Sequence, residues 1–173
     1  MTRILRERSL HKYYKTIVAG DMKADSTIDG YLYKDEKRNV VKLFNEIPKD
    51  NINNESQFSR VKTSYKVLRK GILSDKAGEM KVAELEVLLH TGKTHQIRAH
   101  LSSIGHPIIG DVKYGDNRVN QIIKNKTGLE FQLLHAYKLV FPTFTGELSY
   151  LSGKVFEAEV PDLYKKIENV LFL

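Results

Sequence analysis

The stretch "TGKTHQIRAHL", residues 91–101, joins two segments of different periodicity. Before it, residues 82–92 place most of their apolar side chains on one face of a strand, at Val82, Leu85, Val87 and Leu89. After it, apolar residues recur at helical spacing. A strand, a tight polar turn and a helix are therefore expected to follow one another here, and the helix packs its apolar side on neighbouring structure.

The expected helix has recognisable ends. Thr94 is a good N-cap residue, and Gly105 with Pro107 stops the helix. Ile97, Leu101 and Ile104 lie at i, i+4 and i+7, which makes one apolar stripe.

The rest of the chain alternates strand and helix patterns without repeats. Several short strand patterns lie in adjacent runs, so we expect an α+β fold with a mixed, largely antiparallel sheet and flanking helices. A helix end at 4–12 and a polar loop at 49–58 are also expected. The expected strands are 13–20, a hairpin over 27–44, 63–71, 82–92, 133–141 and 154–160, and the expected helices after the central one are 118–126 and 161–172, with a turn at 143–149.

Composition indicates one soluble globular domain spanning residues 1–173, with 41% hydrophobic and 28% charged residues. The chain has no cysteine and no apolar run near the roughly 20 residues that a membrane span needs. We therefore expect a cytoplasmic protein without membrane contact. The net charge is +7, and five basic residues with no acid lie in 60–70, among them Arg60 and Lys62. Basic clusters interleaved with tyrosines favour an RNA partner, although a solvated surface would look the same.

The central motif admits three interpretations. A phosphate-binding loop is excluded because the glycine required five residues before Gly92 is replaced by Val87. A metal site is disfavoured because His95 and His100 are five residues apart, about 140° around a helix, and no acid lies in the helix. We therefore expect no metal, and a metal-dependent hydrolase is the weakest functional alternative.

The third interpretation starts from Arg98, which borders the apolar stripe. A partly buried guanidinium needs an anionic partner. That partner is either an ordinary salt bridge to another element or a catalytic carboxylate that Arg98 orients.

The stretch "TGKTHQIRAHLSSIGHPIIGDVKYGD" (91–116) resembles the central motif of the RluA-type pseudouridine synthases, which isomerise uridine to pseudouridine in RNA. "LRERSLHKYYKTIVAG" (5–20) is similar to their R-x-x-x-K-x-Y segment, and "LLHAYKLVF" (133–141) to their L-H-A strand. The branch that modifies 23S ribosomal RNA is the most similar. The resemblance implies an isomerase that acts on 23S rRNA and uses no metal or organic cofactor.

The resemblance also implies roles for single residues. Tyr14 would stack on the flipped uracil and accept the C5 proton, and Arg98 would complete the catalytic set. Substrate-binding roles fall to Lys12, to Ile97 beneath the base, and to His95, Gln96, Arg60 and Lys62. Gly110, Asp111, Tyr114 and Gly115 are expected to form a structural loop, and His135 is expected to be a hydrogen-bonded core residue.

One family motif has no counterpart here. The family's catalytic aspartate lies in an R-L-D-x-x-T-S-G motif upstream of the K-x-Y segment, and no aspartate of this chain has those neighbours. We therefore expect the chain to be the C-terminal part of a catalytic domain, without the catalytic-aspartate segment and without an RNA-binding S4 domain. Such a part would be inactive alone and prone to self-association through open sheet edges. The alternative is a non-catalytic RNA-binding remnant of the same fold.

Overall fold

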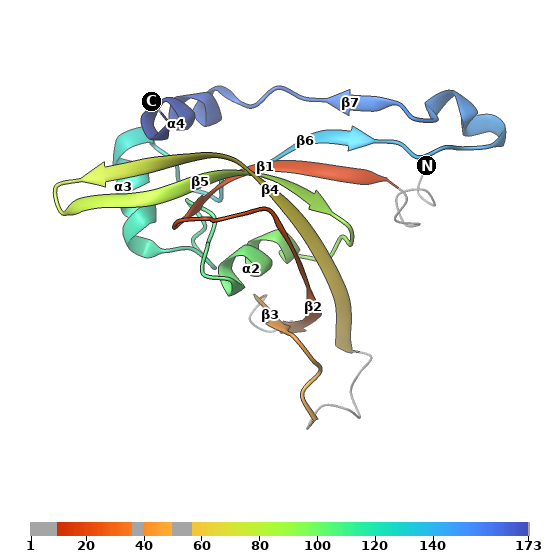
Figure 1. Cartoon of the computed structure of the whole chain (residues 1–173), viewed down its shortest axis with the longest axis horizontal. Helices are drawn as coiled ribbons and strands as arrows, with labels where there is room; N and C mark the ends of the chain where they lie inside the picture. The colour runs from red at the N-terminus through yellow and green to blue at the C-terminus, as the bar shows by residue number, and fades with distance from the viewer. Residues whose placement is uncertain (1–9, 36–39, 50–56, 173) are drawn as a thin grey trace.

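The computed structural model describes residues 10–35, 40–49 and 57–172, and its centre is one seven-stranded sheet. The strand order is β3-β2-β4-β5-β1-β6-β7, and every pairing is antiparallel. Helices accompany the sheet, so the expected α+β class is confirmed (Figure 1). The elements are β1 (His11–Ala19), β2 (Ser26–Asp35), β3 (Val40–Phe44), β4 (Phe58–Asp75), β5 (Gly78–Leu89), α2 (Gln96–Ser103), α3 (Asn117–Thr127), β6 (Leu134–Val140), the 3-10 helix η2 (Gly146–Leu151), β7 (Val155–Glu157) and α4 (Asp162–Leu171).

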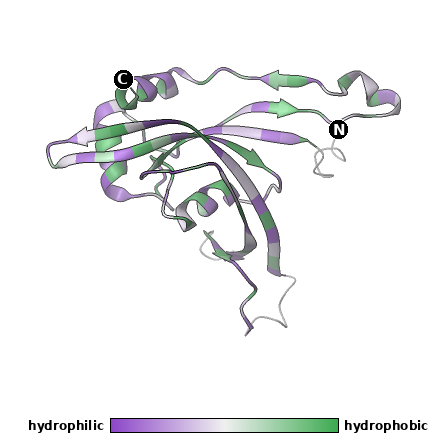
Figure 2. Ribbon diagram, viewed as in Figure 1, coloured by the Kyte–Doolittle hydropathy of each residue, from purple (hydrophilic) through white to green (hydrophobic). Residues whose placement is uncertain are grey.

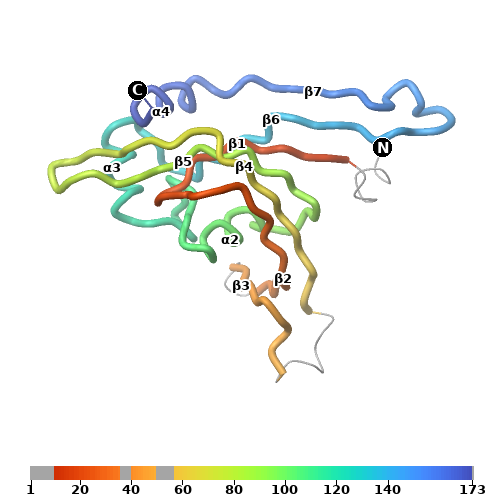
Figure 3. Tube along the Cα trace, in the orientation of Figure 1, coloured from red at the N-terminus to blue at the C-terminus, as the bar shows by residue number. Residues whose placement is uncertain are grey.

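The long strand β4 organises the sheet. Its first half pairs with β2, and β5 pairs with it from Thr63 onward. We call β2, β3 and residues 58–65 of β4 the arm, because in Figure 3 this part of the chain extends away from the remaining strands. The rest of the sheet, with β1 between β5 and β6, forms the body.

The two faces of the sheet differ in what covers them. Thr63 Oγ1 lies 3.0 Å from Gln96 Nε2 and 2.7 Å from His100 Nδ1, so this side of the sheet packs on α2. On the other side, Glu84 accepts a hydrogen bond from Tyr164 in α4. The alternation of polar and apolar residues that separates the faces is visible along the arm in Figure 2. We call these sides the α2 face and the α4 face.

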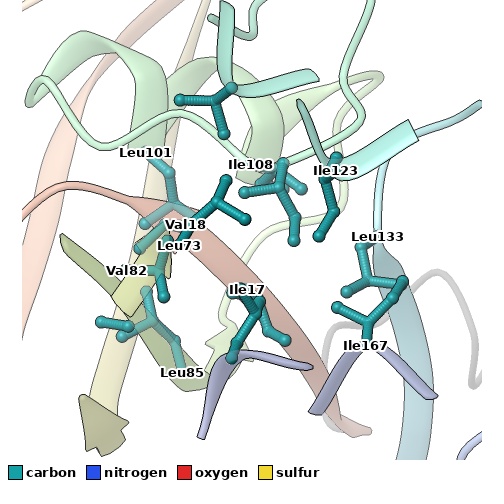
Figure 4. Close-up of a cluster of buried hydrophobic side chains, with 14 of the residues drawn as sticks. Ile17, Val18, Leu73, Val82, Leu85, Leu101, Ile108, Ile123, Leu133 and Ile167 are labelled. Atoms are coloured by element: carbon teal, nitrogen blue, oxygen red, sulfur yellow. The ribbon is translucent and has the colours of Figure 1, made fainter. Parts of the chain in front are cut away.

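Two hydrophobic clusters hold the elements together. The larger lies in the body, where Ile17, Leu101 and Ile123 are completely buried (Figure 4). The smaller joins the arm to α2 through Leu32, Val41, Val61 and Ala99. Because α2 contributes to both clusters, its position is fixed from two sides.

The central helix stops just before Gly105, as predicted, but differs from the sequence prediction at its start. It begins at Gln96, its N-cap is His95, and no side chain caps it, so the prediction of Thr94 as N-cap was wrong. Ile104 lies beyond the helix and is 38% exposed, whereas His100 is fully buried. The polar contacts of His100 and Gln96 with β4 turn that side of α2 toward the sheet, and the predicted apolar stripe is only partly buried.

The other elements follow the prediction with shifted ends. The hairpin 27–44 is β2 with β3, and the helix near 118–126 is α3, capped by the Asp116 side chain. The strand expected over 154–160 is only three residues long, and the expected turn contains η2. Of the helix end expected at 4–12, His11 and Lys12 belong to β1, and residues 4–9 lie outside the described residues, as do 36–39 of the hairpin turn and 50–56 of the polar loop.

Candidate functional site

Tyr14 lies in the middle of β1, on the α2 face. It is opposite Val87 of β5 and Ala136 of β6, and Tyr13 points to the other side of the sheet. Its ring is partly buried and packs against the larger hydrophobic cluster, which includes Ile97 of α2. Burial raises the pKa of the Tyr14 phenol. The phenol therefore stays protonated at neutral pH.

A cavity of about 220 Å³ opens beside Tyr14, between β1, β6 and β7. Lys12, Leu139 and Phe156 line it, and the strand register places these three side by side across the sheet. Phe156 is 51% exposed, so an aromatic and aliphatic wall faces solvent here. Among the described residues that line it, Glu157 is the only one with a carboxylate, and it pairs with Lys138 at 3.2 Å. The cavity is therefore suited to a planar apolar group that lies against Leu139 and Phe156, beside the Lys12 cation.

The start of α2 is built around Gln96. Its Oε1 accepts hydrogen bonds from Lys93 N at 3.1 Å and from Thr91 Oγ1 at 2.9 Å. Its Nε2 donates to the carbonyl of Lys62 and to Thr63 Oγ1. The buried Gln96 side chain thus ties the turn before the helix to β4, which explains why a Thr94 cap is not needed.

His95 adopts a left-handed backbone conformation with φ 55°, which is uncommon for any residue other than glycine. The Tyr114 hydroxyl lies 3.1 Å from His95 Nδ1 and accepts a hydrogen bond from Val41 N at 2.9 Å. The Tyr114 hydroxyl therefore links β3 to the start of α2. Burial and the nearby Arg98 lower the pKa of His95, so it is neutral at pH 7.

Arg98 turns toward the loop that follows α2. Its Nε and Nη2 donate to the two carboxylate oxygens of Asp111 at 2.6 and 2.7 Å. Its guanidinium also lies 5.2 Å from the Tyr114 ring. Asp111 further accepts from the backbone N–H groups of Lys113 and Tyr114. Burial opposes ionisation of Asp111, but these hydrogen bonds outweigh it and lower its pKa.

Within the described residues, the ordinary salt bridge is therefore the partnership that Arg98 makes. Asp111 and Tyr114 were predicted to lie in a structural loop, with no connection to Arg98. The structure shows that they hold α2, this loop and β3 in one hydrogen-bonded chain.

Arg60 and Lys62 do not lie with the other candidate residues. Thr63 and Tyr65 point to the α2 face, so Arg60 and Lys62, at even positions of β4, point to the opposite side. The α2 face therefore carries Lys12, Tyr14, Gln96 and Ile97, and the two basic residues face away from them.

The Nε2 atom of His135 is buried and has no hydrogen-bond partner among the described residues. His100 Nε2 is likewise buried without a hydrogen-bond partner among the described residues. In the described part of the chain, no group of three or more His, Asp or Glu side chains is placed to hold a metal ion. None of the described helices is long and apolar enough to cross a membrane.

Comparison with known proteins decides the family. The sequence model of the RNA pseudouridylate synthase family matches residues 1–103, which include Tyr14 and all of α2. The chain belongs to the RNA pseudouridylate synthase family. Within it, the relatives indicate the RluA-type group, as the sequence motif predicted.

Three relatives show how much of the chain is shared. It is 33% identical to an RNA pseudouridine synthase of Aquifex aeolicus, over 99% of this chain and 48% of that protein. Identity is 28% with the tRNA pseudouridine synthase C of Vibrio parahaemolyticus, over 93% and 62% of the two chains. It is 29% with the ribosomal large subunit pseudouridine synthase D of Nitrosomonas europaea, over 94% and 41%. The chain thus spans about half the length of these relatives.

The fold is also that of solved structures. Human RNA pseudouridylate synthase domain containing 1 superposes with a TM-score of 0.67 over 98% of this chain and 60% of the human chain, at 24% identity. A second human protein, domain containing 4, superposes with a TM-score of 0.66 at 22% identity. The family fold therefore extends through the described residues.

Proposed function

We propose that this chain is part of an RNA pseudouridine synthase that converts uridine to pseudouridine in 23S rRNA. The observation that supports the proposal is the family match over residues 1–103, within which Tyr14 lines an open cavity between β1, β6 and β7. In this reaction the N1–C1′ bond breaks, the uracil turns, and a C5–C1′ bond forms. The C5 proton leaves to solvent and N1 takes up a proton, so the product is an isomer of uridine. The target base must first leave its stack and enter a pocket.

Tyr14 supplies the stacking surface for that base. Its raised pKa keeps the hydroxyl protonated, so the phenol is a poor acceptor for the C5 proton. We therefore assign the ring, rather than the hydroxyl, the main role. Lys12 lies on the same strand face and is placed to meet a phosphate near the bound nucleotide.

Arg98 has a positioning role in this proposal. Asp111 uses Nε and Nη2 of the guanidinium, which leaves Nη1 for a second carboxylate. Asp111 itself is a poor nucleophile, because both of its oxygens accept hydrogen bonds and its side chain is fully buried. A catalytic carboxylate oriented by Arg98 would have to come from elsewhere.

That carboxylate belongs to the R-L-D-x-x-T-S-G motif, which does not occur in the 173 residues. We propose that the chain alone is inactive and that residues outside it supply the catalytic aspartate. Within the described residues, the cavity beside Tyr14 has no aspartate in its lining, which supports this proposal. The second candidate function is a non-catalytic RNA-binding remnant, favoured by the net charge of +7.

Tritium release from RNA labelled at uracil C5 tests the proposal. The 173-residue chain should release none above background. The same chain fused to a family segment that contains the R-L-D motif should release tritium, and an aspartate-to-asparagine change in that motif should abolish the release. An active bare chain would disprove the missing-aspartate proposal, whereas a silent fusion that binds RNA would favour the remnant.

The substrate class needs its own measurement, because relatives are named for both large-subunit ribosomal RNA and tRNA. We propose 23S rRNA, and a cytoplasmic location with it. The active fusion should modify a 23S transcript in preference to a tRNA transcript. Preference for tRNA would reject the ribosomal assignment without affecting the reaction.

A further inference from the structure

The outer side of the arm, away from α2, carries a group of aromatic residues. Tyr31 and Tyr33 of β2 lie on this side with Phe44 of β3 and Phe58 of β4, as the pairings Tyr31–Phe44 and Tyr33–Phe58 require. Ring centroids are 5.4 Å apart for Tyr33 and Phe58 and 5.7 Å apart for Phe44 and Phe58. We call these four rings the aromatic platform.

The aromatic platform lies outside the hydrophobic cores. The arm contributes Leu32, Val41 and Val61 to the cluster with α2, and none of the four rings belongs to either cluster. Figure 1 shows α2 beside the arm on one side, while α4 lies at the far end of the body. Among the described elements, no helix covers the platform, and all four rings are partly exposed.

Basic side chains surround the rings. Lys42 is opposite Tyr33, Arg60 is opposite Tyr31, and Lys62 follows on the same side of β4. The Arg60 side chain is 73% exposed. Two acids of β2, Asp29 and Asp35, lie on this side as well, and Asp29 bonds to Arg60 through both oxygens. The surface therefore combines ring faces with an excess of positive charge.

We propose that the aromatic platform with Lys42, Arg60 and Lys62 binds an unpaired RNA segment. It would be a second contact, on the side of the sheet opposite Tyr14. Aromatic rings on a sheet stack with bases, which requires that the bases be unpaired, and nearby cations neutralise phosphates. The inference rests on the proposed function in so far as the partner is RNA, but it concerns a different surface.

A second copy of the chain fits this surface less well than RNA does. Two platforms facing each other would bring Lys42 and Lys62 of one chain toward the same cations of the other, and like charges oppose such contact. Charge complementarity therefore favours a polyanion. Unpaired RNA is the polyanion that also offers planar groups to the rings.

Binding of a fluorescein-labelled decauridylate to the 173-residue chain, followed by fluorescence anisotropy, tests the proposal. Tyr33→Leu with Phe58→Leu keeps apolar volume but removes two stacking faces. We expect about tenfold weaker binding of decauridylate and little change for a hairpin duplex of equal charge. Tyr150→Leu is the matched control, because Tyr150 is a 62% exposed tyrosine in η2, outside the arm, and should leave Kd unchanged.

A charge variant keeps the test decisive if the leucine variant fails to fold. Lys42→Gln with Lys62→Gln removes two exposed cations without touching the rings. The slope of log Kd against log salt should fall by about 0.7 for each phosphate that the variant no longer neutralises. An unchanged slope, or unchanged decauridylate binding in a folded leucine variant, would overturn the proposal. Equal weakening on duplex and single strand, or a dimer that disappears in the leucine variant, would overturn it as well.

The outcome of the decauridylate binding test does not depend on whether the chain is catalytically active. The four rings lie on the side of the sheet opposite Tyr14, so a loss of decauridylate binding in the Tyr33→Leu, Phe58→Leu variant reports on the platform and not on the cavity beside Tyr14. If the active-site proposal failed, no tritium would be released, yet the anisotropy comparison would still decide whether the platform binds RNA.

Discussion

Arg98 and Asp111 form a two-pronged ion pair that joins α2 to the loop after it, with both N–O distances below 2.8 Å. The Asp111 side chain is completely buried, and that of Arg98 is 13% exposed. The pair is therefore part of the framework that sets the position of α2, in addition to any role of Arg98 toward a catalytic carboxylate.

Removing one partner should reveal this structural role. Arg98→Met leaves the Asp111 carboxylate buried with only backbone donors, so the free energy of unfolding should fall by about 3–5 kcal/mol in urea denaturation. Arg98→Met with Asp111→Asn should recover part of the loss. Arg60→Met, which breaks an exposed ion pair with Asp29, should cause no measurable change. A stable Arg98→Met protein would show that the pair contributes little to the framework.

His100 should make stability depend on pH. Burial lowers its pKa from 6.5 to about 4, so the folded chain keeps His100 neutral where the unfolded chain takes up a proton. Stability is unaffected above the unfolded pKa and falls as the pH drops from 6.5 toward 4. Between pH 7 and pH 5 the loss is about 2 kcal/mol from this group.

His100→Gln should reduce this pH dependence, measured as the change in unfolding free energy between pH 7 and pH 5. Some dependence will remain, because burial lowers the pKa values of His90 and His95 too. His11→Gln, at an exposed position, serves as the control and should behave like the unaltered chain. If the unfolding free energy changes equally between pH 7 and pH 5 in the His100→Gln and His11→Gln variants, His100 is not the group that causes the pH dependence.

Tyr14 variants separate stacking from proton transfer in a catalytically complete synthase. Tyr14→Phe keeps the ring and should retain most of the tritium-release rate. Tyr14→Leu loses the stacking surface, and the rate should fall by about 5- to 150-fold. A phenylalanine variant as slow as the leucine variant would show that the hydroxyl is required, contrary to the role assigned here.

Gly71 is the glycine of β4 that meets α4. A Cβ atom at this position would clash with the backbone carbonyl of Leu171 and with the Phe172 ring. Gly71→Ala should therefore displace the end of α4 and lower stability by about 1–3 kcal/mol in thermal or urea unfolding. Gly92→Ala is the matched control, since a Cβ there meets nothing within 4 Å. Similar losses in both variants would contradict a specific effect of the Cβ atom on α4 packing.

Local patterns predicted the strands and helices better than the contacts between them. Tyr14 was placed on a strand and Ile97 on a buried helix face, because alternation and helical spacing are local properties. The link between Arg98 and Asp111 crosses 13 positions and depends on how the loop folds back, so residue spacing could not specify it.

Neither the N-cap of α2 nor the side of the sheet on which Arg60 and Lys62 lie could be predicted from residue patterns within one element. The N-cap rule favoured Thr94, but the Gln96 side chain organises the turn through contacts with β4, and β4 is distant in sequence. Alternation placed Arg60 and Lys62 on one side of a strand. Which side meets α2 depends on Thr63 and its partners in the folded chain.

A β-bulge at Leu68 divides β4 into two halves, and the alternation of side chains between the two faces shifts by one residue from one half to the other. Val67 is opposite Leu85 and Arg69 is opposite Glu84, so β4 advances two residues while β5 advances one. Odd-numbered residues consequently face α2 before Leu68 and face α4 after it, where Arg69 bonds to Glu84 and to Glu168 of α4. Deleting Leu68 would remove the bulge and leave a regular strand in which Val67 and Arg69 keep their partners on β5, whereas removing one residue elsewhere in β4 would turn one half of the strand over. Adding or removing two residues near the tip of the arm would preserve the alternation of both halves. Related chains can therefore vary the reach of the arm in steps of two residues while the seating of the C-terminal helix stays the same.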